Sequence, residues 1–292
     1  MVRAADALDL SAREIAAMVQ RGEVSALGVA AACFARIEER NPLVTAFLSL
    51  RKQQALMDAA RLDQLRPDLR ARLPLAGVPV AIKDEIAVAG LVTGYGGRGN
   101  SEPAEADAEV VARLRDAGAV VVGTTTQPEF GQVPFTEGAW GETVNPWNAH
   151  YSPAGSSGGA GVAVATGMVP VAIGSDGGGS VRLPAAVGGI FGLKPTRGRV
   201  SAAPYPDLWG ELGTYGPLTR TVGDAATVLD VVSGSTPTDR WQLEVPEEGF
   251  ASALEEEPRG IRIGWSVRPP VPGYAATREV AVAVARAAAL LQ

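Results

Sequence analysis

Helical hydrophobic spacing alternates with short apolar runs along this chain. Segments with apolar residues three and four positions apart predict amphipathic helices. The predicted helices cover residues 11–20, 24–40, 51–64, 107–117, 158–168, 221–233 and 276–291. The apolar runs between them predict buried strands at 77–84, 119–124, 169–174 and 261–267. Because strands that alternate with helices form parallel or mixed sheets, we expect an α/β fold with a mixed, largely parallel β-sheet core flanked by helices.

The two ends of the chain differ in pattern. Residues 1–70 are mainly predicted helix, so we expect a helical N-terminal arm on a single domain that covers 1–292. The last predicted helix stops at Gln292 with no glycine cap, directly after a new predicted strand. An α/β chain rarely ends in this way, and we expect the chain to be C-terminally incomplete, with 202–292 as the start of a C-terminal portion.

Composition narrows the classes of function. Hydrophobic residues make up 46% and charged residues 20%, which is ordinary for a globular protein. The net charge of -6 disfavours direct binding of nucleic-acid phosphates. Cys33, the one cysteine, excludes an internal disulfide and fits a reducing compartment, so we expect a cytoplasmic protein.

One uncharged stretch, 143–175, raises the question of a membrane span. Its apolar part, 158–174, contains Pro170 and five glycines, and it is shorter than the roughly 20 apolar residues that a bilayer requires. We therefore expect a buried helix, a turn and a buried strand here, and no membrane partner.

The stretch SDGGGSVRLP, residues 175–184, carries the first chemical signal. It follows a predicted buried strand and precedes a short predicted helix that begins near Ser180. Successive amide N–H groups in a glycine turn can point into one concave spot that holds an anion. A serine at the edge of such a spot suits acyl transfer, because the oxyanion that forms would meet the N–H donors. The alternative is that Ser180 only caps a helix.

A serine nucleophile also requires a base. The one histidine, His150, lies in a polar loop, and we interpret it as a structural hydrogen-bonding residue. The hydroxyl pair Ser156 and Ser157 lies between glycines at a helix start, which is a weak signal by itself. Lys83 ends the apolar strand GVPVAIKD; a buried lysine could lose its proton near neutral pH and act as the base. The alternative is that Lys83 reaches out to solvent.

Three motifs together resemble the amidase signature family. They are GVPVAIKD (77–84), TVNPWN followed by SPAGSSGGAGVAVATG (143–167), and IGSDGGGSVRLPAAVGGIFGLKPTRGRVS (173–201). The resemblance is strong over 74–201, the signature core, and weaker from Leu8 to about Gly264. The form SDGGGS is more similar to stand-alone amidases than to amidotransferase subunits.

The resemblance implies a Ser–cis-Ser–Lys triad that hydrolyses small-molecule amides without a metal or cofactor. Ser180 would be the nucleophile, Ser156 the bridging serine beside a cis peptide, and Lys83 the base. An acyl-enzyme would form on Ser180. The oxyanion hole that the resemblance implies consists of the backbone N–H groups of Gly177, Gly178, Gly179 and Ser180.

Further residues are expected to support this site. We expect Asp176 and Arg182 to brace the glycine turn, and Asp84 to hydrogen-bond the loop beside Lys83. Aromatic side chains on nearby loops could line an apolar substrate pocket or anchor their loops. The candidates for substrate binding are Trp140, Tyr205 and Trp209.

Several alternatives stay open. A glutaminase-type subunit of an amidotransferase would share the triad and pass ammonia to a partner. An inactive, truncated relative would keep the fold and bind acyl groups without turnover. A homodimer is also possible. The motif GYGGRG (94–99) matches a dinucleotide-binding pattern, but no helix pattern follows it directly, so we interpret it as a loop.

Overall fold

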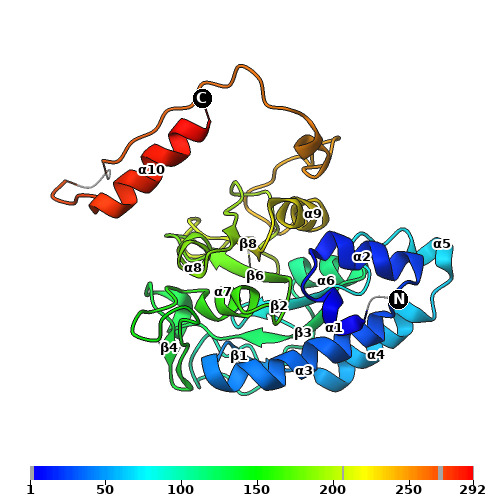
Figure 1. Ribbon diagram of the computed structural model, residues 1–292. Coiled ribbons are helices and arrows are strands. Elements are labelled where there is room, and N and C mark those ends of the chain that lie inside the picture. Colours follow the sequence, from blue (N-terminus) through cyan, green and yellow to red (C-terminus); the bar gives the residue numbers. More distant parts are fainter. Residues whose placement is uncertain (1–2, 206, 269–271, 292) are drawn as a thin grey trace. The chain divides into compact units, whose positions relative to one another are not determined.

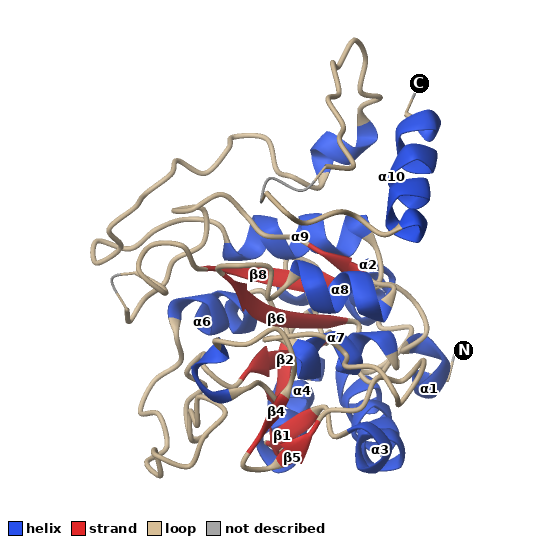
Figure 2. Ribbon diagram, turned by 90° about the vertical axis from the view of Figure 1, so that its left-hand side faces the viewer, coloured by secondary structure: helices blue, strands red, loops and turns tan. Residues whose placement is uncertain are grey.

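A mixed sheet forms the centre of the first of two units into which the chain divides, Met1–Leu254 and Glu255–Gln292. The computed structural model describes residues 3–205, 207–268 and 272–291. The sheet has six strands in the order β1-β3-β2-β6-β8-β7 (Figures 1 and 2). Their bounds are β1 Phe47–Leu50, β2 Pro79–Lys83, β3 Val120–Thr125, β6 Val171–Asp176, β7 Phe191–Gly192 and β8 Thr214–Thr219.

The parallel pairings lie at the middle of this sheet. Strand β2 runs parallel to both β3 and β6, whereas β1, β7 and β8 pair antiparallel with their neighbours. The prediction of a mixed α/β sheet with a parallel core is confirmed. A separate two-stranded hairpin joins β4, Glu137–Gly138, to β5, Gly141–Glu142.

Helices pack on this sheet and on one another within the first unit. They are α1 Ala4–Ala7, α2 Ala12–Arg21, α3 Ala26–Val44, α4 Lys52–Asp63, α5 Pro67–Arg70, α6 Glu109–Asp116, α7 Gly158–Ala165, α8 Arg182–Gly188 and α9 Val222–Val232, with short 3-10 turns at Glu129–Gly131 and Ser252–Glu255. The helical N-terminal region was predicted, but α3 continues through Pro42 to Val44 rather than ending before it. The side chain of Asn41 accepts hydrogen bonds from the backbone N–H groups of Ala46 and Phe47, each at 2.8 Å, and so holds the turn that follows.

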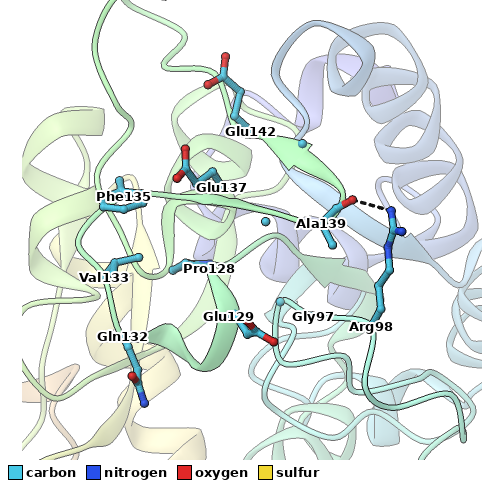
Figure 3. Close-up of a pocket in the computed structure, with 13 residues that line it drawn as sticks. Gly97, Arg98, Pro128, Glu129, Gln132, Val133, Phe135, Glu137, Ala139 and Glu142 are labelled. Carbon is cyan, nitrogen blue, oxygen red and sulfur yellow. Dashed lines mark hydrogen bonds between the residues drawn. The ribbon is translucent and has the colours of Figure 1, made fainter.

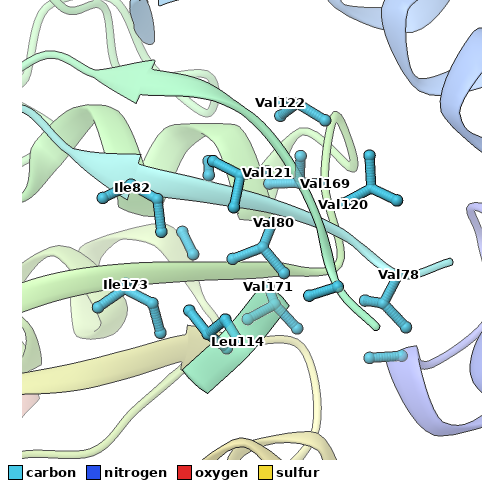
Figure 4. Packing of buried hydrophobic residues seen from close by; sticks show 14 of the residues in the cluster. Val78, Val80, Ile82, Leu114, Val120, Val121, Val122, Val169, Val171 and Ile173 are labelled. Carbon is cyan, nitrogen blue, oxygen red and sulfur yellow. The ribbon is translucent and has the colours of Figure 1, made fainter. Parts of the chain in front are cut away.

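The three parallel strands are buried because both their faces are covered. Valines and isoleucines from β2, β3 and β6 interdigitate in the core (Figure 4). Every residue of β2 and β3 is buried, which matches the continuous apolar runs that the sequence shows. Lys83, at the end of β2, is therefore held in the interior with the apolar strand that carries it.

Small residues allow α7 to lie against the sheet. A Cβ added at Gly159 would be 2.2 Å from Thr126 Oγ1 and 2.6 Å from the Ala46 carbonyl oxygen, so no side chain fits there. The close packing fixes where α7 begins, and Ser156 and Ser157 directly precede it. The glycines of this motif therefore position the two serines next to the sheet.

The described residues of the second unit include the helix α10, Arg278–Leu290. The Thr277 hydroxyl caps it by accepting from Val280 N, so the predicted helix at 276–291 is confirmed. The predicted strand at 261–267 is wrong: this segment has no regular secondary structure and pairs with no strand in the described part of the chain. A strand needs a neighbour for its backbone hydrogen bonds, and Ile261, Ile263 and Trp265 stay exposed. That 202–292 begins a C-terminal portion of one domain stays a prediction.

Candidate active site

Lys83 meets two serines at the carboxyl edge of the parallel strands. Its side chain is fully buried, and its Nζ donates to Ser156 Oγ at 2.7 Å and to Ser175 Oγ at 2.9 Å. Because β2 and β6 are parallel neighbours, their carboxyl ends meet at one edge of the sheet. Ser175 lies within β6, so the fold brings it to the amine at the end of β2.

Burial changes the acidity of this amine. Desolvation lowers the pKa of Lys83 below its usual range, because the interior disfavours the charged form. The nearby carboxylate of Glu85, whose Oε1 lies 3.5 Å from Lys83 Nζ, acts in the opposite direction, and burial outweighs it. The amine is thus easier to deprotonate than an exposed lysine.

Ser156 is held between a tight loop and the glycine turn. Its peptide bond with Gly155 is cis, as expected for the bridging serine. The next residue, Ser157, donates its backbone N–H to the Ser180 carbonyl oxygen at 3.2 Å and its hydroxyl to the Ser175 carbonyl oxygen at 3.3 Å. These bonds join the two serine motifs that the sequence places 24 residues apart.

Ser156 and Ser180 open into one cavity of about 140 Å³. Its wall is formed by Glu85, Phe130, Gly131, Ser156, Ser175, Gly177, Ser180, Leu208, Trp209 and Gly213. Within the described residues, no hydrogen bond joins the hydroxyls of Ser156 and Ser180, although both serines line the cavity.

Asp176 organises the turn that carries Ser180. It is fully buried, and its two carboxylate oxygens accept from the Arg182 guanidinium at 2.8 and 2.9 Å. The same oxygens accept from the backbone N–H groups of Gly179, Val181 and Arg182. Burial alone would raise the pKa of Asp176, but these hydrogen bonds hold it below its usual range. Asp176 and Arg182 thus make the bracing contacts that the sequence predicts.

The same contacts narrow the expected set of oxyanion donors. The Gly179 N–H donates to Asp176 Oδ1 at 2.7 Å and cannot serve another acceptor well. The Gly179 donor is therefore engaged by the aspartate in this structure, and its part in an oxyanion hole stays a prediction. The N–H groups of Gly177, Gly178 and Ser180 have no acceptor within the described part of the chain and are free for a ligand oxygen.

Asp84 holds a neighbouring loop. It is fully buried and accepts from the backbone N–H groups of Gly94 and Gly96 at 3.2 and 3.1 Å. Burial raises its pKa to about 6, and the two backbone hydrogen bonds oppose this shift. The contact matches the loop role predicted for Asp84. The GYGGRG segment is a loop tied to the end of β2, and the next helix begins only at Glu109.

Two of the three candidate substrate-binding aromatics lie at or near this cavity. The Trp209 indole lies over Gly177, where an added Cβ would be 2.0 Å from its Cε3, and it lines the cavity. The Tyr205 hydroxyl hydrogen-bonds that of Tyr95, whose ring stacks on Phe130 with centroids 6.1 Å apart. Phe130 itself lines the cavity.

Trp140 is not among the described residues that line this cavity, and its part in substrate binding stays a prediction. It lies in the turn of the β4–β5 hairpin, and its Nε1 would be 2.6 Å from a Cβ added at Gly138. The tight hairpin turns the indole onto its own backbone. This packing agrees with the alternative interpretation, in which Trp140 anchors its loop.

A larger cavity of about 820 Å³ lies beside the hairpin (Figure 3). Loops at 96–98 and 128–133 line it together with the hairpin, and Arg98 Nη2 donates to the Ala139 carbonyl oxygen at 2.7 Å. No lysine or serine lies in its wall among the described residues. Ser156 and Ser180 line the smaller cavity, which is therefore the candidate active site although the other cavity is larger.

The described residues provide no second candidate site. His150 is exposed, and its backbone N–H donates to Asn148 Oδ1 at 3.0 Å, so a structural role for its imidazole stays a prediction. Across residues 3–205, 207–268 and 272–291, no group of three His, Cys, Asp or Glu side chains is placed to hold a metal ion. In the same ranges, no helix is both long and apolar enough to cross a bilayer.

Two partners of Lys83 were not predicted from the sequence. Ser175 is a polar residue within a buried strand, and that position was the available signal. Glu85 follows Lys83 by two positions, a spacing that many surface loops also show. The pairing of β2 with β6 places Ser175 beside the amine, whereas Glu85 is already close to Lys83 in the sequence.

Comparison with known proteins gives a consistent result. The sequence model of the family named Amidase matches residues 29–292. The chain is 45% identical over 238 residues to "Putative amidase AmiB2" of Mycobacterium tuberculosis, covering 81% of this chain and 50% of that protein. It is 42% identical over 265 residues to a glutamyl-tRNA(Gln) amidotransferase subunit of Maridesulfovibrio salexigens, covering 88% and 53%. The chain thus spans about half the length of the curated relatives it matches.

Solved structures agree with the sequence comparison. The 6-aminohexanoate cyclic dimer hydrolase superposes with a TM-score of 0.90 and 37% identity, covering 97% of this chain and 58% of that one. The peptide amidase of Stenotrophomonas maltophilia superposes with a TM-score of 0.77 and 34% identity, covering 84% and 53%. Both likenesses extend over most of this chain.

Proposed function

The chain belongs to the amidase signature family, and from this premise we propose that it hydrolyses a carboxylic amide to an acid and an amine or ammonia through an acyl-enzyme on Ser180. The proposal is supported by one observation above all. A fully buried lysine donates to Ser156 at 2.7 Å, at the wall of a cavity that Ser180 also lines. An amine held in this way is suited to take a proton that is released in the cavity.

The proton follows a relay in the proposed mechanism. Neutral Lys83 takes the proton of Ser156, and Ser156 takes that of Ser180 as the Ser180 oxygen attacks the amide carbonyl carbon. Lys83 then holds the proton as an ammonium ion. Ser156 passes a proton to the leaving amine, and water attacks the acyl-enzyme through the same relay to release the acid. The two serine hydroxyls must come into hydrogen-bond contact for this step, which a bound substrate can bring about.

The glycine turn stabilises the oxyanion in this proposal. The free N–H groups of Gly177, Gly178 and Ser180 would donate to the carbonyl oxygen as negative charge develops on it. The Asp176 carboxylate keeps the turn in shape through Gly179 N and Arg182. Trp209, lying over Gly177, would close the cavity over the acyl group.

A second candidate function is that of a glutaminase-type subunit in an amidotransferase. It is supported by the 42% identity to a glutamyl-tRNA(Gln) amidotransferase subunit. Such a protein would act on glutamine and transfer ammonia to an acceptor held by a partner. Hydrolysis of glutamine that is stimulated by a co-purifying partner would favour it, whereas hydrolysis of simple amides by the chain alone would favour the stand-alone enzyme.

The proposal also covers the substrate class, the cellular compartment and the oligomeric state. The substrate would be a small amide. A single cysteine, buried and free, supports the cytoplasm as the compartment. A homodimer stays a prediction that the oligomeric state in solution would test.

The test of the proposed function is covalent labelling with a fluorophosphonate, followed by intact mass measurement and peptide mapping. We expect one adduct per chain, on Ser180, and none in Ser180→Ala. Heat-denatured protein serves as the control for nonspecific reaction. Equal labelling of Ser180→Ala, or an adduct at another residue, would overturn the proposal.

A further inference from the structure

Glu85 lies directly against the group proposed to accept the proton. Its Oε1 is 3.5 Å from Lys83 Nζ, and its side chain is 17% exposed. Among the described residues that line the small cavity, Glu85 alone carries a formal charge. It therefore faces both the amine and the space in which a substrate would react.

The carboxylate is held in this position from two sides. The Gln127 side-chain amide, oriented to satisfy its hydrogen bonds, donates to Glu85 Oε2 at 3.2 Å and accepts from Glu85 N at 3.2 Å. Gln127 is itself fully buried. A Cβ added at Gly131 would lie 3.0 Å from Ser156 Oγ, 3.3 Å from Glu85 Oε2 and 3.5 Å from Lys83 Nζ. The three functional atoms therefore gather around one point.

We propose that Glu85 is a positioning residue, whose carboxylate orients the Lys83 amine between Ser156 and Ser175 and stabilises the ammonium ion that forms when Lys83 takes the serine proton. The inference rests on the proposed function. The physical reason is that an uncompensated ammonium ion in the interior is costly, whereas one beside a fixed carboxylate is less so. Glu85 itself neither gains nor loses a proton in the relay.

Other titratable groups near Lys83 and Glu85 could also influence the pKa of Lys83. Asp84 follows Lys83 in the chain, and Asp176 acts on Lys83 from β6, although Arg182 pairs with it. Burial raises the pKa values of Tyr95 and Tyr215, so both phenols stay neutral across the pH range of interest. Asp84, with a pKa of about 6, is the neighbour that could titrate together with the amine.

The chain allows a direct measurement of Lys83, because its lysines are only Lys52, Lys83 and Lys194. Protein labelled with ¹³C-lysine gives few side-chain signals, and Lys83→Met identifies the one that matters by its loss. We expect Glu85→Gln to lower the pKa measured for Lys83 by about one unit or more, since an opposite charge at this distance favours the charged form. In the rate of fluorophosphonate labelling, the rising limb of the pH profile should move to lower pH by the same amount.

Three further variants test whether the change in the Lys83 pKa comes from the charge of Glu85. Glu129→Gln removes an exposed carboxylate at the larger cavity and should leave the Lys83 titration unchanged. Glu85→Asp keeps the charge and should leave the Lys83 pKa close to its wild-type value, and it serves as a second variant if Glu85→Gln proves unstable. The shift should persist in an Asp84→Asn background, which removes the neighbouring titration.

The result that overturns the inference is a Lys83 titration in Glu85→Gln that is unchanged or moved to higher pH. Because the NMR titration needs no substrate, this outcome is distinct from failure of the proposed function. In that second case the wild-type chain would not label at Ser180, whatever the Lys83 titration shows.

Discussion

Lys83 Nζ and Ser156 Oγ lie 2.7 Å apart although 73 residues separate them in the chain. The lysine ends an inner strand of the sheet, and the serine precedes a helix of glycine, alanine and valine that packs on that sheet. Both side chains are withdrawn from solvent, since they are 0% and 1% exposed. The contact therefore depends on the packing of α7 against the strand that carries the lysine.

Replacing Lys83 by methionine removes the proposed base while keeping an unbranched side chain. We expect the labelling rate and amide hydrolysis to fall about 100-fold or more, which is the typical contribution of a general base. The thermal midpoint should fall, because Ser156, Ser175 and the Glu85 carboxylate each lose a buried partner. Lys83→Arg is the matched control and should also be inactive, since a guanidinium keeps its proton. Substantial activity in either variant would contradict the relay.

The pH dependence of the reaction should show the lowered pKa of Lys83. Only the neutral amine can accept a proton, so the rate should rise about tenfold per pH unit below this pKa and level off above it. Because burial lowers the pKa, the plateau should begin well below the pH at which an exposed lysine deprotonates. The fluorophosphonate labelling rate of Ser180, measured against pH, checks this. A rate that falls as pH rises across this range would show that the charged lysine is the active form.

Asp176 should contribute to stability in a pH-dependent way. Its pKa is lowered in the folded state, so its contribution is fully present above the unfolded value, near pH ~4, and is lost as pH falls through the folded value. We expect Asp176→Asn to lower the free energy of unfolding by about 2 kcal/mol at neutral pH. The difference from wild type should shrink as the solution is acidified below the unfolded value, as measured by urea unfolding.

Asp116→Asn is the matched control for this measurement. Asp116 is exposed at the end of α6, and its replacement should change stability by less than about 0.5 kcal/mol at either pH. A destabilisation by Asp176→Asn that stays constant into the acid range would mean that ionisation of Asp176 is not its source.

Close packing of α7 should make Gly159 intolerant of a side chain. In Gly159→Ala the new methyl would lie 2.2 Å from Thr126 Oγ1 and 2.6 Å from two backbone atoms, which cannot move easily. We expect a loss of about 3 kcal/mol or more in the free energy of unfolding, together with loss of labelling as Ser156 shifts. Thermal and urea unfolding provide the measurement.

Gly188→Ala offers the matched comparison in α8. Its added Cβ would meet its nearest neighbour at 3.6 Å, an ordinary contact. Stability should therefore change by less than about 1 kcal/mol, and alanine can gain from its higher helix propensity. If Gly159→Ala destabilised the protein no more than Gly188→Ala does, the close contacts of Gly159 would not limit the size of the side chain at that position.

The local pattern of the sequence predicted most elements of the fold. Short apolar runs identify the buried strands that contain Lys83 and Ser175. A run of small residues identifies the helix after Ser157. The segment 261–267 has the same apolar pattern but no strand partner in the described chain. A pattern reports how a strand would be buried, whereas a strand forms only where a neighbour supplies hydrogen bonds.

By itself, the sequence determined the chemical groups: a glycine turn before Ser180, a serine pair before a small-residue helix, and a lysine on an apolar strand. Only the tertiary structure decided which residues surround these groups. It placed Ser156 and Ser175 beside Lys83, from which they are 73 and 92 residues distant along the chain. The physical reason is that backbone periodicity is a local property. Contacts between distant side chains depend on the order β3-β2-β6, which no short segment specifies.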